Sequence, residues 1–220
     1  MQRLDAQRRV ARIHRERAEH DKALEHLRGA LALFAAIGDQ RGLASSYDDM
    51  AQIHRMRGEL TQALAAAKEA LQIRVQLQDR RAQAVSLNTI GRIELDQGMF
   101  DSAQARFTTA LKIRESISDH EGAVQTRIAL GQLAFRRGRS DEAIRTYLGA
   151  LEAAREMNNR RFQSYTLSFL GEAYLQQGEL DRADAALREA TRLAAALRDQ
   201  NALATIERTF AQLTSRRPPG

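Results

Sequence analysis

A glycine recurs every 40 residues over much of the 220-residue chain, and this period constrains the fold more than any other feature of the sequence. One alanine follows each glycine by five residues, a second follows seven residues later, and an Asp or Asn closes each repeat. Agreement at four phases indicates a repeat protein, in which one small unit stacks on the next. The series are Gly58, Gly98, Gly138 and Gly178, with Ala18 in the first repeat; Ala23, Ala63, Ala103, Ala143 and Ala183; Ala30, Ala70, Ala110, Ala150 and Ala190; and Asp39, Asp79, Asp119, Asn159 and Asp199.

Each repeat is predicted to form two helices, here named helix A and helix B. In the third repeat helix A covers residues 82–97 and helix B covers residues 101–118. Gly98 stands where a helix ends on a left-handed residue. Connections of about three residues make neighbouring helices antiparallel. The only two prolines are Pro218 and Pro219, so no proline interrupts a helix before them, and the predicted fold class is all-α.

Polar residues precede the predicted helices, where a side-chain oxygen can accept hydrogen bonds from free backbone N–H groups. For helix A these N-cap candidates are the closing residues Asp39, Asp79, Asp119, Asn159 and Asp199. For helix B they are Asp21, Thr61, Asp101, Asp141 and Asp181. Between the caps, apolar residues follow the helical period, and the recurring alanines allow two helix axes to approach at the close end of the ~8–10 Å range.

The third repeat carries the clearest resemblance to a known family. Ile90-Gly91, Ala103, Phe107 and Ala110 occupy the Leu-Gly pair, the two small positions and the aromatic position of the tetratricopeptide repeat. The resemblance extends over about residues 4–199. The period of 40 exceeds the usual ~34, and the usual proline in helix B is missing. This long form is similar to the repeats of kinesin light chains, Pins/LGN polarity adaptors and bacterial regulators.

The resemblance implies a right-handed α-α superhelix made of five antiparallel hairpins and one further helix. The repeats are expected at about residues 1–39, 40–79, 80–119, 120–159 and 160–199. A lone helix over residues 200–214 is expected to cover the fifth hairpin. Residues 1–214 would then form a single array, followed by a disordered tail over residues 215–220.

In this family the A helices line a concave groove that suits an extended peptide or a partner protein. We therefore expect a protein-interaction scaffold whose groove is charged in its N-terminal half and more apolar in its C-terminal half. Asn88 is the strongest single candidate, because an amide can both donate to and accept from a peptide backbone. The expected groove residues are Arg12, Asp48, Gln52, Arg55, Asn88, Arg92, Ile128, Gln132, Phe135, Arg136, Tyr165, Phe169 and Glu172.

Two other roles remain open at this point. The array could be the sensor or regulatory arm of a larger signalling or transcription regulator, or it could associate with itself into a homo-oligomer. The groove residues could also be merely solvated, or pack against the next helix. Binding of a C-terminal carboxylate, as in the chaperone-binding members of the family, is rejected. Arg8 and Arg12 match that clamp, but Asp48 and Asp49 would repel the ligand.

The sequence points away from catalysis and from cofactors. Cysteine is absent, which removes disulfides, thiol nucleophiles and cysteine zinc sites. No phosphate-binding loop, H-E-x-x-H or G-x-S-x-G motif occurs. His14 and His54 occupy the tyrosine position of the family, so we expect them to stack inside their hairpins rather than bind a metal. We therefore expect no enzyme activity and no cofactor.

The net charge of +6 is dispersed over the chain, which disfavours nucleic acid as the partner. A basic stripe at Arg8, Arg12 and Arg15 is followed closely by Glu16 and Glu19. No apolar run approaches the ~20 residues that span a bilayer, and the N-terminal residues do not resemble a signal peptide. A cytoplasmic location without membrane contact is expected.

Overall fold

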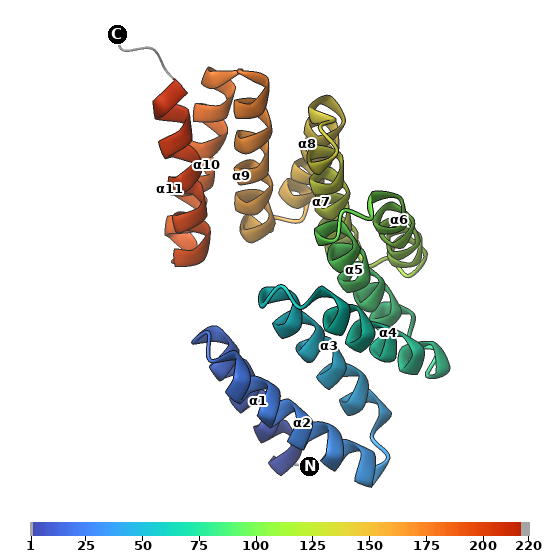
Figure 1. Ribbon diagram of the computed structural model, residues 1–220. Coiled ribbons are helices and arrows are strands. Elements are labelled where there is room, and N and C mark those ends of the chain that lie inside the picture. Colours follow the sequence, from blue (N-terminus) through green and yellow to red (C-terminus); the bar gives the residue numbers. More distant parts are fainter. Residues whose placement is uncertain (1, 217–220) are drawn as a thin grey trace. The chain divides into compact units, whose positions relative to one another are not determined.

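The computed structural model describes residues 2–216, with the side chains of residues 7–15 and 17–216. Within this range the chain forms eleven α-helices and no strand, which confirms the predicted fold class (Figure 1). Odd-numbered helices are A helices, and each of α1, α3, α5, α7 and α9 packs against the helix that follows it. The helices are α1 (Gln2–Glu16), α2 (His20–Ile37), α3 (Gln40–Met56), α4 (Leu60–Gln76), α5 (Arg80–Asp96), α6 (Phe100–Ser116), α7 (His120–Arg136), α8 (Ser140–Glu156), α9 (Arg160–Gln177), α10 (Leu180–Leu197) and α11 (Gln200–Arg216).

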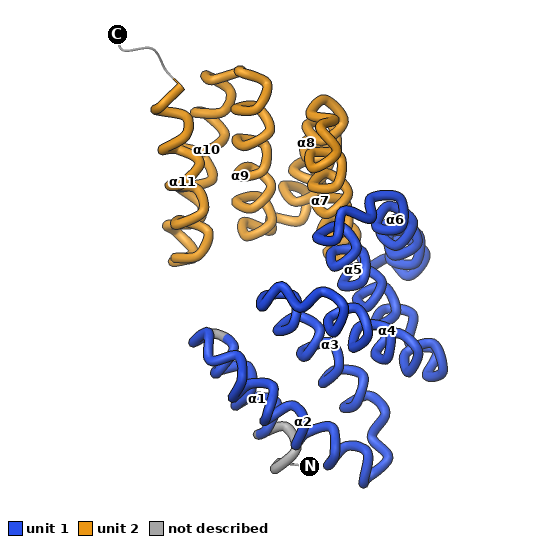
Figure 2. Tube along the Cα trace, in the orientation of Figure 1, with its two compact units in different colours: residues 1–119 blue, residues 120–220 orange. Residues whose placement is uncertain are grey.

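The chain divides into two compact units, Met1–Asp119 and His120–Gly220, here named unit 1 and unit 2 (Figure 2). Unit 1 holds the hairpins α1–α2, α3–α4 and α5–α6. Unit 2 holds α7–α8 and α9–α10, followed by α11. The boundary falls between the third and fourth predicted repeats. One continuous array over residues 1–214 remains a prediction.

The periodic glycines adopt the backbone conformation that was predicted for them. Gly58, Gly98, Gly138 and Gly178 have φ between 74° and 80°, a left-handed conformation that glycine reaches without steric cost. In the first repeat Ala18 takes the same place with φ 57°. The second helix of each repeat also ends on a left-handed residue, and only one of these five is a glycine: Gly38, Gln78, Ser118, Asn158 and Arg198.

Ala18 offers a direct test of this helix end. The Ala18→Gly variant is expected to raise the free energy of unfolding by about 1 kcal/mol, because it removes the clash of a Cβ atom in the left-handed conformation. Ala18 is exposed, so no packing is lost with its methyl group. The reverse change, Gly98→Ala, should lower stability by a similar amount. Urea denaturation of both variants measures this, and equal stability of Ala18→Gly and the parent would refute it.

The predicted caps of the A helices are confirmed where the structure shows them. Asp39 Oδ1 accepts from the Gly42 N–H at 2.9 Å, and Asp79 Oδ1 accepts from the Ala82 N–H at 3.0 Å. Asn159 and Asp199 do the same for α9 and α11 at 3.1 Å each. These residues fix where each of four A helices begins.

The predicted caps of the B helices are wrong. These helices begin two residues earlier than such caps require, so Asp21 and Thr61 lie inside α2 and α4. The reason is the left-handed residue, which lets the helix start only two residues later; the Leu60 N–H already donates to the Gly58 carbonyl at 2.9 Å. The actual N-cap residues make no side-chain cap hydrogen bond, and they are Glu19, Glu59, Met99, Arg139 and Glu179.

Within a hairpin, a small residue on helix A faces a large side chain on helix B. A Cβ atom at Gly91 would lie 2.6 Å from Phe107 Cε1, and one at Gly131 would lie 2.4 Å from Tyr147 Cε1. Both aromatic rings are buried, so neither can move aside. In the first repeat the small residue is an alanine, Ala11, which packs in one cluster with a leucine. Each glycine therefore makes room for one large side chain of its own hairpin.

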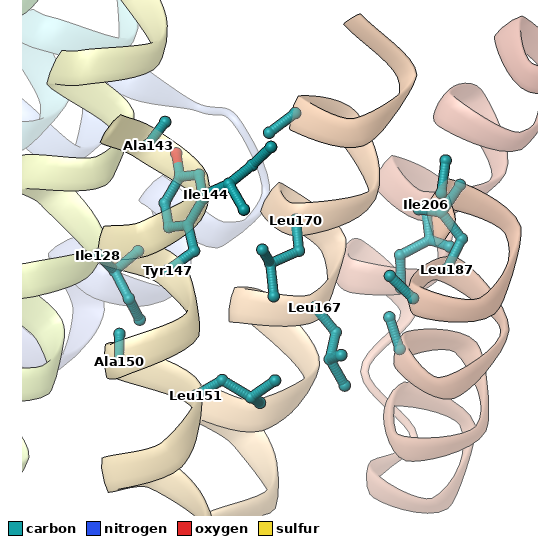
Figure 3. Packing of buried hydrophobic residues seen from close by; sticks show 14 of the residues in the cluster. Ile128, Ala143, Ile144, Tyr147, Ala150, Leu151, Leu167, Leu170, Leu187 and Ile206 are labelled. Carbon is teal, nitrogen blue, oxygen red and sulfur yellow. The ribbon is translucent and has the colours of Figure 1, made fainter. Parts of the chain in front are cut away.

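The core of unit 2 continues through α11. Leu170 of α9, Leu187 of α10 and Ile206 of α11 belong to one cluster of buried residues (Figure 3). Leu213, one of the most completely buried residues of α11, joins them. The predicted lone helix is thus confirmed as a covering element for the fifth hairpin.

The helix α11 runs two residues further than predicted. Ser215 and Arg216, expected in the disordered tail, are helical, and the Arg216 guanidinium donates to the Leu175 carbonyl at 2.8 Å. Pro218 restricts the residue just before it, so it does not prevent a helix through Arg216. The rest of the expected tail, residues 217–220, lies outside the described residues.

Candidate functional site

Polar side chains join the A helices of unit 1 to one another. The Arg15 guanidinium donates to Gln52 Oε1 at 3.0 Å, and that of Arg55 donates to Asp96 Oδ2 at 2.8 Å. These bonds link α1 to α3 and α3 to α5. Of the expected groove residues, the structure therefore brings Gln52 and Arg55 onto one surface with neighbours from the adjacent A helix. We name the face of α1, α3 and α5 that carries these bonds the A surface of unit 1.

A cavity of about 530 Å³ opens between α1 and α3. Arg8, Arg9, Arg12 and Asp49 line it. The Asp49 carboxylate accepts from the Arg8 guanidinium at 3.0 Å, while Arg9 and Arg12 are exposed. The predicted groove residue Arg12 thus lies in a basic recess that already contains a carboxylate. That carboxylate is the feature on which the chaperone-type clamp was rejected.

Asp48 does not lie open to a ligand as expected. It is 5% exposed, and its carboxylate forms an ion pair with Arg74 of α4. The Arg74 guanidinium also donates to Ser86 Oγ of α5 at 2.7 Å, and the Ser86 hydroxyl donates to Asp48 Oδ1 at 3.4 Å. Asp48 therefore ties α3, α4 and α5 together. Sequence reasoning missed this network, although an arginine at a position filled by Phe34 in the first repeat signals a buried cation that needs a partner.

The buried position of Asp48 makes an unusual pH dependence testable. Burial raises the pKa of the Asp48 carboxyl even though Arg74 and Ser86 favour the charged form. A folded pKa above the unfolded value means that ionisation disfavours the folded state. The contribution of Asp48 to stability should therefore decrease as the pH rises from about 3.8 through the folded pKa, and stay constant above it. Urea denaturation of the parent and of a chain with both Asp48→Leu and Arg74→Met, compared across this pH window, measures the change. A difference that grows in favour of the parent would contradict it.

Asn88 occupies the same repeat position as Asp48, one repeat later, and has a different environment. It is also 5% exposed, yet its Oδ1 atom is buried with no hydrogen-bond partner among the described residues. One helical turn further along α5, Arg92 is partly buried and makes no hydrogen bond or ion pair with any residue that the structure describes. Buried polar atoms are nearly always paired, so the two side chains hold unused bonding capacity on the A surface of unit 1.

In unit 2 the expected apolar groove residues are partly taken up by the core. Ile128 of α7 is 5% exposed and belongs to the core cluster of unit 2 (Figure 3). The Tyr165 hydroxyl donates to Asp199 Oδ2 at 3.0 Å, and the Phe169 ring stacks on Tyr147 with centroids 5.7 Å apart. Phe135 is also only partly buried.

The remaining expected residues of unit 2 are polar and accessible. Gln132 is half-buried, whereas Arg136 and Glu172 are exposed. The A helices α7 and α9 are adjacent in the structure, so their side chains share one face of unit 2. Together with Phe169 and Phe135, this face offers a mixture of polar groups and aromatic edges.

The two histidines at the tyrosine position lie inside their hairpins. His14 stacks on His26 of α2 with ring centroids 5.3 Å apart, as expected for His14. Nδ1 of His14 and of His54 each lie within hydrogen-bond distance of a glutamate, Glu19 at 2.7 Å and Glu59 at 2.6 Å. These hydrogen bonds lower the pKa of both glutamates. The described side chains, those of residues 7–15 and 17–216, contain no cluster of three His, Cys, Asp or Glu that could hold a metal ion.

None of the described helices is both long and apolar enough to cross a membrane. No curated protein sequence matches the chain significantly. Solved structures with the same fold do match. A putative kinesin light chain from Podosopora anserina with nearly identical TPR-like repeats is 16% identical, with 90% of this chain and 98% of that chain covered and a TM-score of 0.67.

Two longer proteins superpose more closely. The Rap conjugation gene regulator of plasmid pLS20, solved in complex with the Phr* peptide, is 13% identical with a TM-score of 0.85, covering 98% of this chain and 60% of that chain. Aspartyl phosphate phosphatase F from Bacillus subtilis is 14% identical with a TM-score of 0.83, covering 96% of this chain and 55% of that chain. At these identities the likeness shows a shared fold.

The sequence itself provides the stronger assignment. The family model described as tetratricopeptide repeat matches residues 2–74, 81–156 and 130–196, which together span nearly the whole helical region. The matched segments contain the left-handed glycines Gly58, Gly98, Gly138 and Gly178, and the small residues Gly91 and Gly131 that face large side chains. The chain belongs to the tetratricopeptide repeat family.

Proposed function

We propose that this chain is a protein-interaction scaffold that binds an extended peptide, or an extended segment of a partner protein, along the A helices. The observation that carries the proposal is the Asn88 amide, whose buried Oδ1 atom has no partner among the described residues. A peptide backbone supplies the N–H group that such an acceptor requires. The Rap regulator of pLS20, which shares the fold, was solved with a peptide bound.

The proposed contacts differ between the two units. In unit 1 the ligand would meet Arg12, Gln52, Arg55, Asn88 and Arg92, whereas Asp48 serves the packing of the helices. In unit 2 it would meet the polar and aromatic face of α7 and α9, formed by Gln132, Phe135, Arg136, Phe169 and Glu172, with Tyr165 held by Asp199. Ile128 would support this face from the core.

The proposal describes binding without catalysis. No catalytic motif occurs in the sequence, and no cofactor is part of the proposed role. One protein with the same fold is named an aspartyl phosphate phosphatase, so hydrolysis of an aspartyl phosphate is the activity to assay. Hydrolysis of an aspartyl phosphate by this chain alone would contradict the proposal.

A second candidate is a regulatory arm that acts on an output domain. This chain superposes on only 60% of the Rap conjugation gene regulator and 55% of the phosphatase described above, which favours a role within a larger system. The difference is testable with the product of the native gene. An output activity that changes when A-helix residues are substituted would support this role, and an unchanged output would support the simple scaffold.

The scaffold is tested by selecting ligands from a random displayed peptide library. The intact chain is compared with a variant carrying Asn88→Ala, Arg92→Ala and Gln132→Ala. We expect the intact chain to enrich a related set of peptides and the variant to bind them at least about tenfold more weakly.

A matched control uses three residues that share one position of the B helices. Gln72, Lys112 and Glu152 are exposed on α4, α6 and α8, and their triple alanine variant should bind like the intact chain. Equal affinity of all three proteins for the enriched peptides would show that the A helices do not form the binding surface. Failure of the intact chain to enrich any peptide would overturn the proposal itself.

A further inference from the structure

Three arginines on the A helices of unit 1, Arg8, Arg15 and Arg55, are bonded to side chains of the neighbouring A helix. The ion pair of Arg8 with Asp49 and that of Arg55 with Asp96 each join helices one repeat apart. Arg92 departs from this pattern, because it makes neither a hydrogen bond nor an ion pair within 4.0 Å among the described residues. Its guanidinium is a partly buried cation without an ion-pair partner among the described residues.

The charges around Arg92 leave a local positive excess. Asp96 is the nearby carboxylate, but its Oδ2 atom already accepts from Arg55 at 2.8 Å. Burial lowers the pKa of Arg92, and the nearby guanidiniums of Arg55 and Arg114 lower it further. An arginine stays protonated at neutral pH even when its pKa is lowered. The partly buried charge therefore gains from any anion that can reach it.

Asn88 supplies an independent sign of a ligand at the same place. It precedes Arg92 by one helical turn, so the two side chains lie on the same face of α5. Its buried Oδ1 atom is an acceptor without a partner among the described residues, and the residue as a whole is 5% exposed. Within the described part of the chain, Asn88 thus lacks a hydrogen-bond donor, and Arg92, four residues later, lacks a paired anion. A peptide whose backbone N–H lies next to a carboxylate would supply both.

We propose that Arg92 sets the specificity of the peptide site and selects a ligand that carries an Asp or Glu side chain. The inference rests on the proposed function and names the chemistry of its ligand. Arg92 would bind the carboxylate with two parallel N–H donors, the arrangement that makes arginine–carboxylate pairs strong. Asn88 Oδ1 would accept the backbone N–H beside that residue.

The surroundings favour a peptide over a nucleic acid. A phosphate backbone repeats its negative charge along its whole length and gains affinity from many cations at once. The A surface of unit 1 instead carries carboxylates, Asp49 and Asp96, beside its arginines. A single partly buried cation beside these ion pairs suits one isolated acidic side chain.

The test uses a random displayed peptide library against four proteins: the intact chain, Arg92→Gln, Arg92→Glu and the control Lys112→Gln. Lys112 is an exposed cation on α6, so its variant removes the same charge outside the A helices. The intact chain and Lys112→Gln should enrich peptides with Asp or Glu at one fixed position. Arg92→Gln should lose this preference, and Arg92→Glu should replace it with Lys or Arg.

Affinities of one enriched synthetic peptide complete the test. Changing its acidic residue to the amide, or changing Arg92 to Gln, should each weaken binding at least about 30-fold, and the double change should cost little more than either alone. Thermal unfolding of Arg92→Gln controls for loss of the fold.

The outcomes separate the two proposals. The role of Arg92 is refuted, while the scaffold stands, if the intact chain enriches peptides that have no fixed acidic position. The same holds if Arg92→Gln binds the enriched acidic peptides as tightly as the intact chain does. If no peptide is enriched by any protein, the proposed function itself fails. Binding of single-stranded oligo-dT that is lost in Arg92→Gln would assign Arg92 to nucleic acid instead and overturn the inference.

Discussion

The Arg74→Met variant is expected to lose about 3–5 kcal/mol of unfolding free energy, because it leaves the Asp48 carboxylate buried without its counter-charge. Asp48 is 5% exposed and accepts from both Arg74 and Ser86 in the interface of three helices. The substitution also removes the hydrogen bonds that Arg74 donates to Ser86 and to the Ala82 carbonyl. Urea denaturation at neutral pH measures the loss.

A double variant shows why Arg74→Met loses stability. The loss can come from the Asp48 carboxylate left buried without a partner, or from a net stabilisation of the fold by the intact ion pair. Buried ion pairs are often no better than apolar residues of similar volume, since removing both charges from water is costly. The chain with Asp48→Leu and Arg74→Met should therefore recover most of the stability that Arg74→Met loses. A double variant that is as unstable as the single one would show that the ion pair stabilises the fold directly. A loss below about 1 kcal/mol in Arg74→Met would refute the buried network.

The second large effect is expected at Tyr147, where Tyr147→Ala should lower stability by about 3–5 kcal/mol. The ring is 1% exposed in the core of unit 2 and fills the space that Gly131 leaves open. It also supports Phe169, which stacks on it from α9. Loss of the ring therefore creates a cavity and frees one residue of the proposed binding face.

The conservative change Tyr147→Phe is the control, because it keeps the ring and removes only the hydroxyl. Burial raises the pKa of this hydroxyl strongly, so it stays neutral and little stability should change. Adding Gly131→Ala to the parent should destabilise it, since the new methyl group meets the ring. The same change beside Tyr147→Leu should cost less, because an alanine and a leucine already share a cluster in the first hairpin. Thermal unfolding of the parent, Gly131→Ala, Tyr147→Leu and the double variant measures these costs. Additive effects of the two substitutions would contradict the packing described here.

How much of this protein could be predicted from its sequence depended on whether a feature repeats. Gly98 and Asp79 set helix ends through local backbone conformation and local hydrogen bonds, so their roles can be read from one repeat. The caps of the B helices were misplaced by two residues, because the left-handed turn before them is tighter than the assumed loop.

The groove residues were harder to predict, because their environment depends on other helices. Asp48 and Asn88 share one repeat position and the same exposed fraction, but only Asp48 has a partner in the helix that follows. Ile128 continued the apolar pattern of the groove in sequence, and the structure places it in the core. Periodicity identifies the face of a helix, while the partners of a side chain come from residues outside its own repeat.

The pairing of small and large residues has a consequence for the ancestry of the chain. Gly91 and Phe107 lie in one 40-residue segment, and so do Gly131 and Tyr147, so a tandem gene duplication copies both halves of the fit together. The Arg55–Asp96 bridge spans two segments, so a duplicated copy inherits only one end of it. Descent by duplication would thus conserve the interior of each hairpin from its first generation, while the bridges between hairpins had to arise afterwards, one junction at a time.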